Sequence, residues 1–232
     1  MVIKINMVGL LKERITNFIT AFDLNNITVD CREKHYETTV EIEGEGENVD
    51  TLIRELYTEF KPSIYGTNEE NIYTAAFELL KFKGLKLSIA EDVSAGRICS
   101  ELVSANTDIA DVLLEGVVCF SDESKCVRLG LDKSFFNSHT SQSVECCYEL
   151  ASGMIMTSSA DLVIATTGYA EQNSVNNGKC FIAVGDKNFI HVFKHHFEGT
   201  INHIIQQISK FALLHLIKKL RENDFDFAQN VI

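Results

Sequence analysis

The order of hydrophobic and polar positions in residues 1–66 predicts a small α/β domain. Apolar side chains recur at helical spacing over residues 10–22 and again over 52–60. Residues 37–43 alternate between apolar and polar side chains, which is typical of a half-buried strand. A short strand at 27–31 is expected to pair with them as a hairpin.

The remaining residues, 67–232, alternate between strand-like and helix-like runs. Residues 62–67 contain the one proline of the chain and are expected to form a hinge or domain junction. The runs predict strands at 85–90, 116–120, 162–166, 179–184 and 189–193, and helices at 67–84, 97–104, 121–128, 143–158 and 200–223. Such alternation is typical of a three-layer α/β/α domain with a mostly parallel sheet, which we expect over residues 67–232.

A turn of small residues, 91–96, lies between an expected strand and an expected helix. Backbone N–H groups and the positive end of a helix are presented at such a turn. Both favour a negative charge, as on a bound anion or a developing oxyanion. The turn is therefore the first candidate for a site.

Charge and composition argue against a membrane protein, a secreted protein and a nucleic-acid-binding protein. Of the 232 residues, 45% are hydrophobic and 23% charged, which is ordinary for a globular protein. No apolar run approaches the roughly 20 residues of a membrane span, and no secretory signal pattern is seen, so we expect a cytoplasmic protein without a membrane partner. The net charge of -12 argues against nucleic acid as a partner, because phosphate binding needs basic surface.

The cysteine and histidine patterns do not indicate a metal site, and no cofactor is expected. The chain has an odd number of cysteines and no CxxC pair: Cys31, Cys99, Cys119, Cys126, Cys146, Cys147 and Cys180. They are interpreted as reduced core thiols. Four histidines near the C-terminal end lack accompanying acids or cysteines and are interpreted as surface residues: His191, His195, His196 and His203.

Four short segments resemble the motifs of one family, in the same order and with the same spacing. Residues 90–96 (AEDVSAG) resemble A-E-S-x-T-G-G, and residues 116–125 (GVVCFSDESK) resemble G-x-V-x-Y-S-N-E-x-K. Residues 160–170 (ADLVIATTGYA) and 178–183 (GKCFIA) are similar to A-D-x-x-x-x-x-T/S-G-I-A and G-x-V-x-I-A. The family is the competence/damage-inducible CinA family. The likeness implies its C-terminal domain preceded by its small middle domain, and we expect no counterpart of its N-terminal molybdopterin-binding-like domain.

The resemblance implies an activity and a set of site residues. The family's C-terminal domain hydrolyses the carboxamide of nicotinamide mononucleotide, with the motif serine as nucleophile activated by a lysine and a tyrosine. Carried over by position, the candidate catalytic residues are Asp92, Ser94 and Lys125, and the candidate substrate-binding residues are Gly96, Phe120, Asp122, Thr167 and Gly168. It also implies a pyridine nucleotide-like ligand and a homo-oligomer, with a dimer favoured.

This chain departs from the family pattern at its centre. Asp92 stands where the family has the nucleophilic serine, and Phe120 stands where it has the tyrosine. Two expected arginines are Glu115 and Ile201, and the glycine-rich loop after the third motif reads EQNSV over residues 171–175. For a substrate that carries a phosphate, these changes are an electrostatic penalty.

Several interpretations of the altered site remain open. Asp92 could be a carboxylate nucleophile, but an ion pair with Lys125 is favoured because carboxylate attack on an amide is a poor route. Ser94 could replace the nucleophile with Lys125 as its base, but it is more simply a helix cap. The chain as a whole could be an inactive family member with a binding or regulatory role, an altered amidohydrolase, or a structural protein. We expect negligible deamidation of nicotinamide mononucleotide.

Overall fold

The structure, a computed structural model, describes residues 1–171 and 174–229. The chain folds as two compact units, Met1–Ala75 and Ala76–Ile232. The division falls within helix α3 (Ile72–Lys83), and the domain boundary expected after residue 66 stays a prediction.

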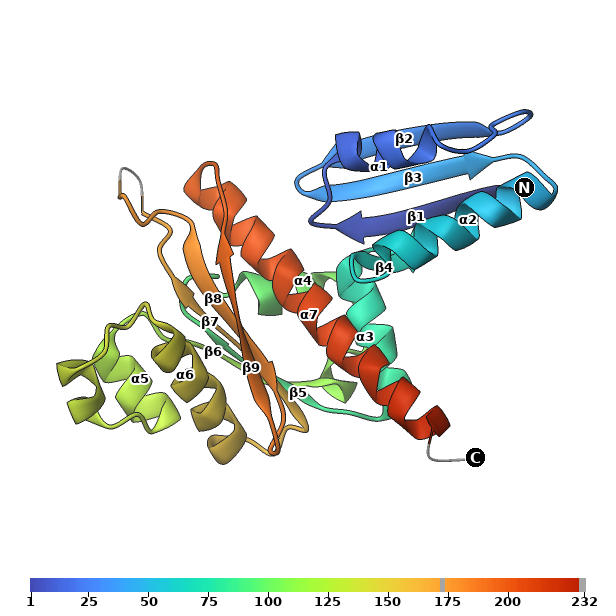
Figure 1. The fold of residues 1–232 in the computed structure, drawn as a ribbon. Coiled ribbons are helices and arrows are strands. Elements are labelled where there is room, and N and C mark those ends of the chain that lie inside the picture. The colour runs from blue at the N-terminus through green and yellow to red at the C-terminus, as the bar shows by residue number, and fades with distance from the viewer. Residues whose placement is uncertain (172–173, 230–232) are drawn as a thin grey trace. The chain divides into compact units, whose positions relative to one another are not determined.

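The first unit is a four-stranded antiparallel sheet with two helices (Figure 1). Its elements are β1 (Val2–Val8), α1 (Lys12–Ile19), β2 (Thr28–Lys34), β3 (Glu37–Glu43), α2 (Glu47–Phe60) and β4 (Ile64–Thr67). The strand order β2-β3-β1-β4 gives the split βαβ arrangement known as ferredoxin-like. Alternate strand residues such as Ile5, Val40 and Ile42 are buried with the apolar faces of both helices, so the hydrophobic periodicity of each element is satisfied by one core.

The predicted hairpin is confirmed, while two details around the junction were wrong. β2 and β3 pair antiparallel with Cys31 opposite Val40. Residues 62–67 were expected to be a hinge or domain junction, yet Ile64–Thr67 is strand β4 of the first unit, which pairs with β1 and buries Ile64 and Tyr65. The next helix was expected from residue 67 but begins at Ile72, because the Asn71 side chain accepts hydrogen bonds from the N–H groups of its first turn.

The second unit is built on a five-stranded mixed sheet. Its further elements are β5 (Leu87–Glu91), α4 (Arg97–Ala105), β6 (Leu113–Val118), α5 (Asp122–Leu129), α6 (Val144–Thr157), β7 (Leu162–Gly168), β8 (Lys179–Gly185), β9 (Ile190–His196) and α7 (Ile201–Gln229), with short 3-10 turns at Ile109–Asp111 and Lys133–Asn137. The strand order is β6-β5-β7-β8-β9. The pairs of β5 with β6 and β7 are parallel, whereas β7-β8 and β8-β9 are antiparallel.

The helices of this unit form a layer on each face of the sheet, which confirms the three-layer α/β/α arrangement (Figure 1). Helices α5 and α6 cover one face, where Ala90, Val163 and Ala165 pack against apolar residues of α6. Helices α4 and α7 cover the other face. Within the described part of the chain, no helix is long and apolar enough to span a membrane.

Candidate functional site

The candidate site lies where the three parallel strands end. Carboxyl ends of neighbouring parallel strands meet at one edge of a sheet, and ligand sites of α/β proteins gather there. Asp92 follows β5, Asp122 begins α5 after β6, and Thr167 lies near the end of β7. Topology therefore brings together three residues that are far apart in the sequence.

The turn after β5 has the predicted strand–turn–helix form. Asp92 lies between β5 and α4, neither within a strand nor within a helix, as expected. Ala95 and Gly96 both have left-handed backbone, with φ of +57° and +83°. Gly96 adopts this conformation freely, whereas Ala95 stands where the family has glycine and costs on the order of 1 kcal/mol of strain. The alanine is therefore accommodated in the left-handed region.

Asp92 and Lys125 form a buried ion pair, which confirms the predicted pairing. The Lys125 Nζ lies 2.9 Å from the Asp92 Oδ2, and the lysine side chain is 0% exposed. Ser121 caps α5 by accepting a hydrogen bond from the Ser124 N–H, and this fixes the first turn of the helix from which Lys125 projects. The ammonium is thus held against the carboxylate by a rigid element.

A third side chain, Thr167, completes this cluster. Its hydroxyl Oγ1 lies 2.8 Å from the Asp92 Oδ2 and 2.6 Å from the carbonyl oxygen of Ser141. One hydroxyl proton cannot be donated to both oxygens at once. Burial raises the pKa of the Asp92 carboxyl, although the hydrogen bonds from Lys125 and Thr167 oppose the shift. The Thr167 hydroxyl therefore donates to one of the two oxygens at a time, and the pKa of Asp92 reflects the balance between burial and these hydrogen bonds.

A second buried cluster surrounds Glu91, which the sequence analysis did not single out. The Glu91 carboxylate accepts hydrogen bonds from the N–H groups of Ile98 and Cys99 at the start of α4, at 3.1 and 2.9 Å. It also accepts one from the Ser94 hydroxyl at 2.7 Å. A signal was available, because an acid at the end of a buried strand, separated from a helix by one short turn, can accept hydrogen bonds from the first N–H groups of that helix.

The interpretation of Ser94 as the cap of α4 is wrong. The helix N-cap is Gly96, and Glu91 supplies the acceptor that Ser94 was expected to supply. Ser94 is fully buried, and its Oγ lies 2.7 Å from the Thr166 Oγ1 as well as from Glu91. Thr166 and Ser141 are two further cluster members that sequence reasoning missed.

The remaining candidate residues line the edges of these clusters. Asp122 accepts a hydrogen bond from the Ser141 hydroxyl, which links it to Thr167 through one residue. Gly168 ends β7 with a φ of +150°, and a Cβ there would lie 2.5 Å from the carbonyl oxygen of Lys179. Phe120 is 62% exposed, and Gly96 is the N-cap of α4. Their roles as substrate-binding residues stay predictions.

The neighbouring thiols are poor nucleophiles. Burial raises the pKa of the Cys146 thiol to about 12, and burial also raises the pKa values of Cys99 and Cys119. A thiol must lose its proton to attack, so these groups stay inert near neutral pH. Among the described residues, no group of three or more His, Cys, Asp or Glu side chains is placed to hold a metal ion.

Comparison with known proteins identifies the family. The family model of the CinA C-terminal domain matches residues 69–220, which is well over half of the chain. The chain belongs to the CinA family. A competence-damage inducible protein of Caldicellulosiruptor saccharolyticus is 30% identical over 72% of this chain and 41% of its own length. A CinA-like protein of Fusobacterium nucleatum is 29% identical over 81% of this chain and 48% of its own length.

Solved structures of the CinA superfamily match the second unit's fold. A superfamily protein from Klebsiella pneumoniae aligns with a TM-score of 0.60 and 26% identity, and the match covers 66% of this chain and 99% of that one. A competence-damaged superfamily protein from Escherichia coli aligns with a TM-score of 0.58 and 25% identity over 63% of this chain. The chain spans about two fifths to one half of the curated CinA relatives named above.

Proposed function

We propose that this CinA-family chain has lost the nicotinamide mononucleotide deamidase activity that the motifs imply, and that it serves a binding, regulatory or structural role. The observation that carries the proposal is the buried Asp92–Lys125 pair at 2.9 Å. The group in the nucleophile position is a carboxylate, and the lysine that would activate a serine is instead its ion-pair partner. A general base must be free to take the nucleophile's proton.

The other residues of the site support the same proposal. Phe120 has no hydroxyl to assist proton transfer, and Glu115 would repel a substrate phosphate where an arginine would attract it. Ser94 could in principle replace the lost serine. It is fully buried, however, and its hydroxyl is paired with Glu91 and Thr166 rather than presented to a substrate.

The proposal also covers the location of the chain, its assembly and its ligand. We expect a cytoplasmic homo-oligomer, with a dimer favoured, that keeps a pyridine nucleotide-like ligand or has lost it. A thermal melting series with nicotinamide mononucleotide and its nicotinate counterpart separates the two cases, because a ligand of the native state raises the midpoint. Light scattering across a concentration series measures the oligomer.

Ammonia release from nicotinamide mononucleotide tests the loss of activity. The unmodified chain, Asp92→Ser and the double variant Asp92→Ser, Phe120→Tyr are compared at equal concentration. Removing one member of a nucleophile unit costs several orders of magnitude in rate, so the unmodified chain is expected to give no release above background. Robust turnover by the unmodified chain overturns the proposal. In that case Ser94→Ala and Asp92→Asn identify which residue is the nucleophile.

The double variant measures what the scaffold has kept. If it releases ammonia slowly, the pocket has survived and only the chemistry was lost. If it releases none, adding Glu115→Arg tests whether the charge inversion alone excludes the phosphate. Lys81→Arg, at an exposed position of α3 outside these motifs, is the matched control and is expected to leave every rate unchanged.

A further inference from the structure

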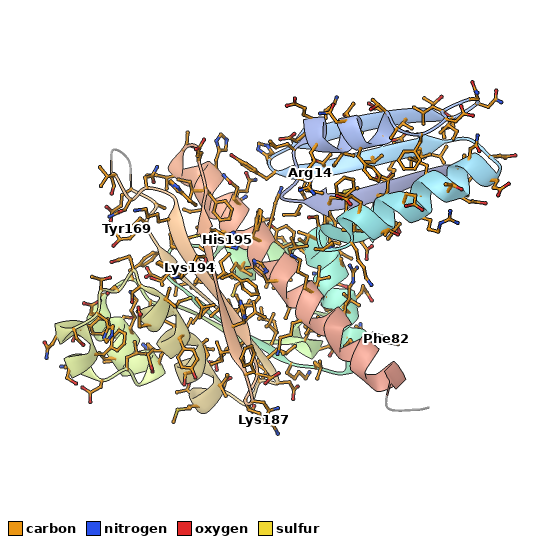
Figure 2. The ribbon with its side chains drawn as sticks, viewed as in Figure 1. Arg14, Phe82, Tyr169, Lys187, Lys194 and His195 are labelled. Carbon is orange, nitrogen blue, oxygen red and sulfur yellow. The ribbon has the colours of Figure 1, made fainter. Side chains whose placement is uncertain are left out.

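A third polar cluster, apart from those of Asp92 and Glu91, lies in the same unit between strand β9 and helix α7. β9 is the edge strand of the sheet. Ile190 and Val192 pack into the core beneath α6, so the alternate residues Phe193 and His195 face the other way. Figure 2 labels His195 on β9 beside α7. The earlier interpretation of His195 as a surface residue is wrong, because it is half-buried and bonded to a residue of α7.

The centre of the cluster is a pair of histidines. The Nε2 atoms of His195 and His215 lie 2.9 Å apart, and His215 stacks on the Phe193 ring with centroids 3.6 Å apart. His215 is 6% exposed, yet its other ring nitrogen, Nδ1, has no hydrogen-bond partner among the described residues. An unpaired polar atom at that depth costs about 1–3 kcal/mol, so a partner is expected to occupy the space beside it.

That space exists. A cavity of about 200 Å³ is lined by Val184, Phe189, His191, Phe193, His215, Lys218 and Lys219. Its lining combines aromatic and aliphatic walls with two ammonium groups, and Lys219 is also 2.8 Å from the Asp186 carboxylate. The charged groups at this cavity therefore include the ammonium groups of Lys218 and Lys219 and the Asp186 carboxylate beside Lys219. The volume is below the roughly 300–1,000 Å³ of sites for drug-sized ligands, so the occupant is small.

We propose that this cavity binds a small aromatic carboxylate, whose ring lies among the apolar walls and whose carboxylate accepts a hydrogen bond from His215 Nδ1–H near the two lysines. The site is separate from the Asp92–Lys125 cluster and independent of the proposed loss of activity. In the proposed arrangement the His195 Nε2–H donates a hydrogen bond to the unprotonated Nε2 of His215, so that His215 carries its own proton on Nδ1.

The site combines a neutral hydrogen-bond donor, His215, with the positively charged side chains of Lys218 and Lys219. Burial, with the nearby Lys218 charge, lowers the pKa of His195 to about 4, and burial, with His195 and Lys218, lowers the pKa of His215 to about 2. Both imidazoles are therefore neutral near pH 7. The lysines provide the positive charge that attracts an anion, and the hydrogen bond from His215 orients it. A cationic ligand would meet two ammonium groups, and a purely apolar one would leave Nδ1 unpaired.

Nitrogen NMR of the full chain labelled with ¹⁵N-histidine tests the proposal directly, with benzoate as the probe. In the free protein, His215 is expected to show the tautomer with the proton on Nδ1. Benzoate is expected to shift the Nδ1 resonance of His215 in a saturable way, while the resonances of His35, in the first unit, stay fixed. Inorganic phosphate is titrated in parallel to separate a ring carboxylate from any small anion.

Two variants locate the site and one controls for lost charge. Lys218→Met is expected to weaken benzoate binding about fivefold to tenfold, since a charged hydrogen-bonding partner is lost. His215→Phe keeps the stack on Phe193 and is expected to weaken binding at least as much. Lys187→Met removes an exposed lysine from the β8–β9 turn outside the cavity (Figure 2) and should leave the affinity within twofold.

The outcomes divide cleanly. Saturable binding of benzoate that both cavity variants weaken, and that Lys187→Met does not, supports the proposal. It is overturned if benzoate causes no saturable shift. It is also overturned if phosphate binds and benzoate does not, or if the cavity variants bind benzoate as tightly as the unmodified chain. Far-UV circular dichroism of each variant confirms that the comparison is made between folded proteins.

Discussion

The second unit contains two buried polar pairs that differ in how completely they are satisfied. At Asp92 and Lys125, neither residue leaves a fully buried side-chain atom without a partner. At His195 and His215, one buried nitrogen has no partner among the described residues, and a cavity of about 200 Å³ lies beside it. A buried nitrogen with no partner has an unmet hydrogen bond that a ligand can complete, whereas the Lys125 ammonium already has the Asp92 carboxylate as an acceptor. The family resemblance therefore indicates the Asp92–Lys125 site, and the buried nitrogen without a partner indicates the cavity beside His215.

The strongest way to break the first pair is to remove its cation. Lys125→Met leaves a buried carboxylate without its charge partner, and such a change costs about 3–5 kcal/mol. Urea unfolding at pH 7 is expected to show this loss of unfolding free energy. The double variant Lys125→Met, Asp92→Leu removes both charges and should recover most of it, because apolar replacement of a buried pair is often neutral or stabilising.

The matched control is Lys81→Met, which removes a partly exposed lysine that pairs with Asp108 at 3.3 Å. Exposed pairs contribute under about 1 kcal/mol, so little change is expected. Equal losses in Lys125→Met and Lys81→Met would mean that the buried pair has no special role in stability.

The Glu91 cluster gives the next largest effect. Glu91→Gln keeps the shape of the side chain but replaces one acceptor oxygen with a donor NH₂ group. That group would face the Ile98 N–H or the Cys99 N–H, which lie 3.1 and 2.9 Å from the present oxygens. A buried donor left unpaired costs about 2–3 kcal/mol, and urea unfolding measures it. An unchanged midpoint would show that α4 does not depend on this cap.

Removing His195 measures how much the histidine pair contributes to stability, for comparison with the Asp92–Lys125 pair. His195→Leu leaves both nitrogens of His215 unpaired, and a loss of about 1–2 kcal/mol is expected in the same assay. The effect is smaller than for Lys125 because no charge is stranded. His196→Leu, at an exposed neighbouring position, should change little. A loss in His196→Leu that matched the loss in His195→Leu would contradict the assignment.

Much of the fold could be predicted from the sequence, because buried strands and amphipathic helices follow simple periods. The hairpin of residues 28–43 and the Asp92 turn are examples. β4 was misread, since a short strand after a proline looks like a linker until its partner β1 is known. Strand pairing is a long-range property that local periodicity does not record.

The candidate site was predicted in part, and for a definite reason. Motif order placed Asp92 opposite Lys125, because a family fold fixes which positions meet. Glu91 was missed because its role depends on N–H groups of the next helix, and the role of Ser94 was misassigned for the same reason. The His195–His215 pair joins two elements with no motif between them. The nitrogen without a partner among the described residues becomes apparent only when β9 and α7 are packed together.

The smallest effect, and the finest test of the comparison, is the titration of Asp92. Burial raises the pKa of Asp92, whereas hydrogen bonds from Ser134 lower the pKa of the exposed Asp132. Carboxyl ¹³C shifts followed from pH 2 to 7 should therefore give a higher midpoint for Asp92 than for Asp132. A raised carboxyl pKa means that the folded chain holds the proton more tightly than the unfolded chain. Its stabilising contribution is full below the unfolded value of about 3.9 and is lost as the pH rises through the folded value. An Asp92 midpoint below that of Asp132 would show that Lys125 and Thr167 outweigh burial, and the site would then be a stabilising ion pair with the opposite pH dependence.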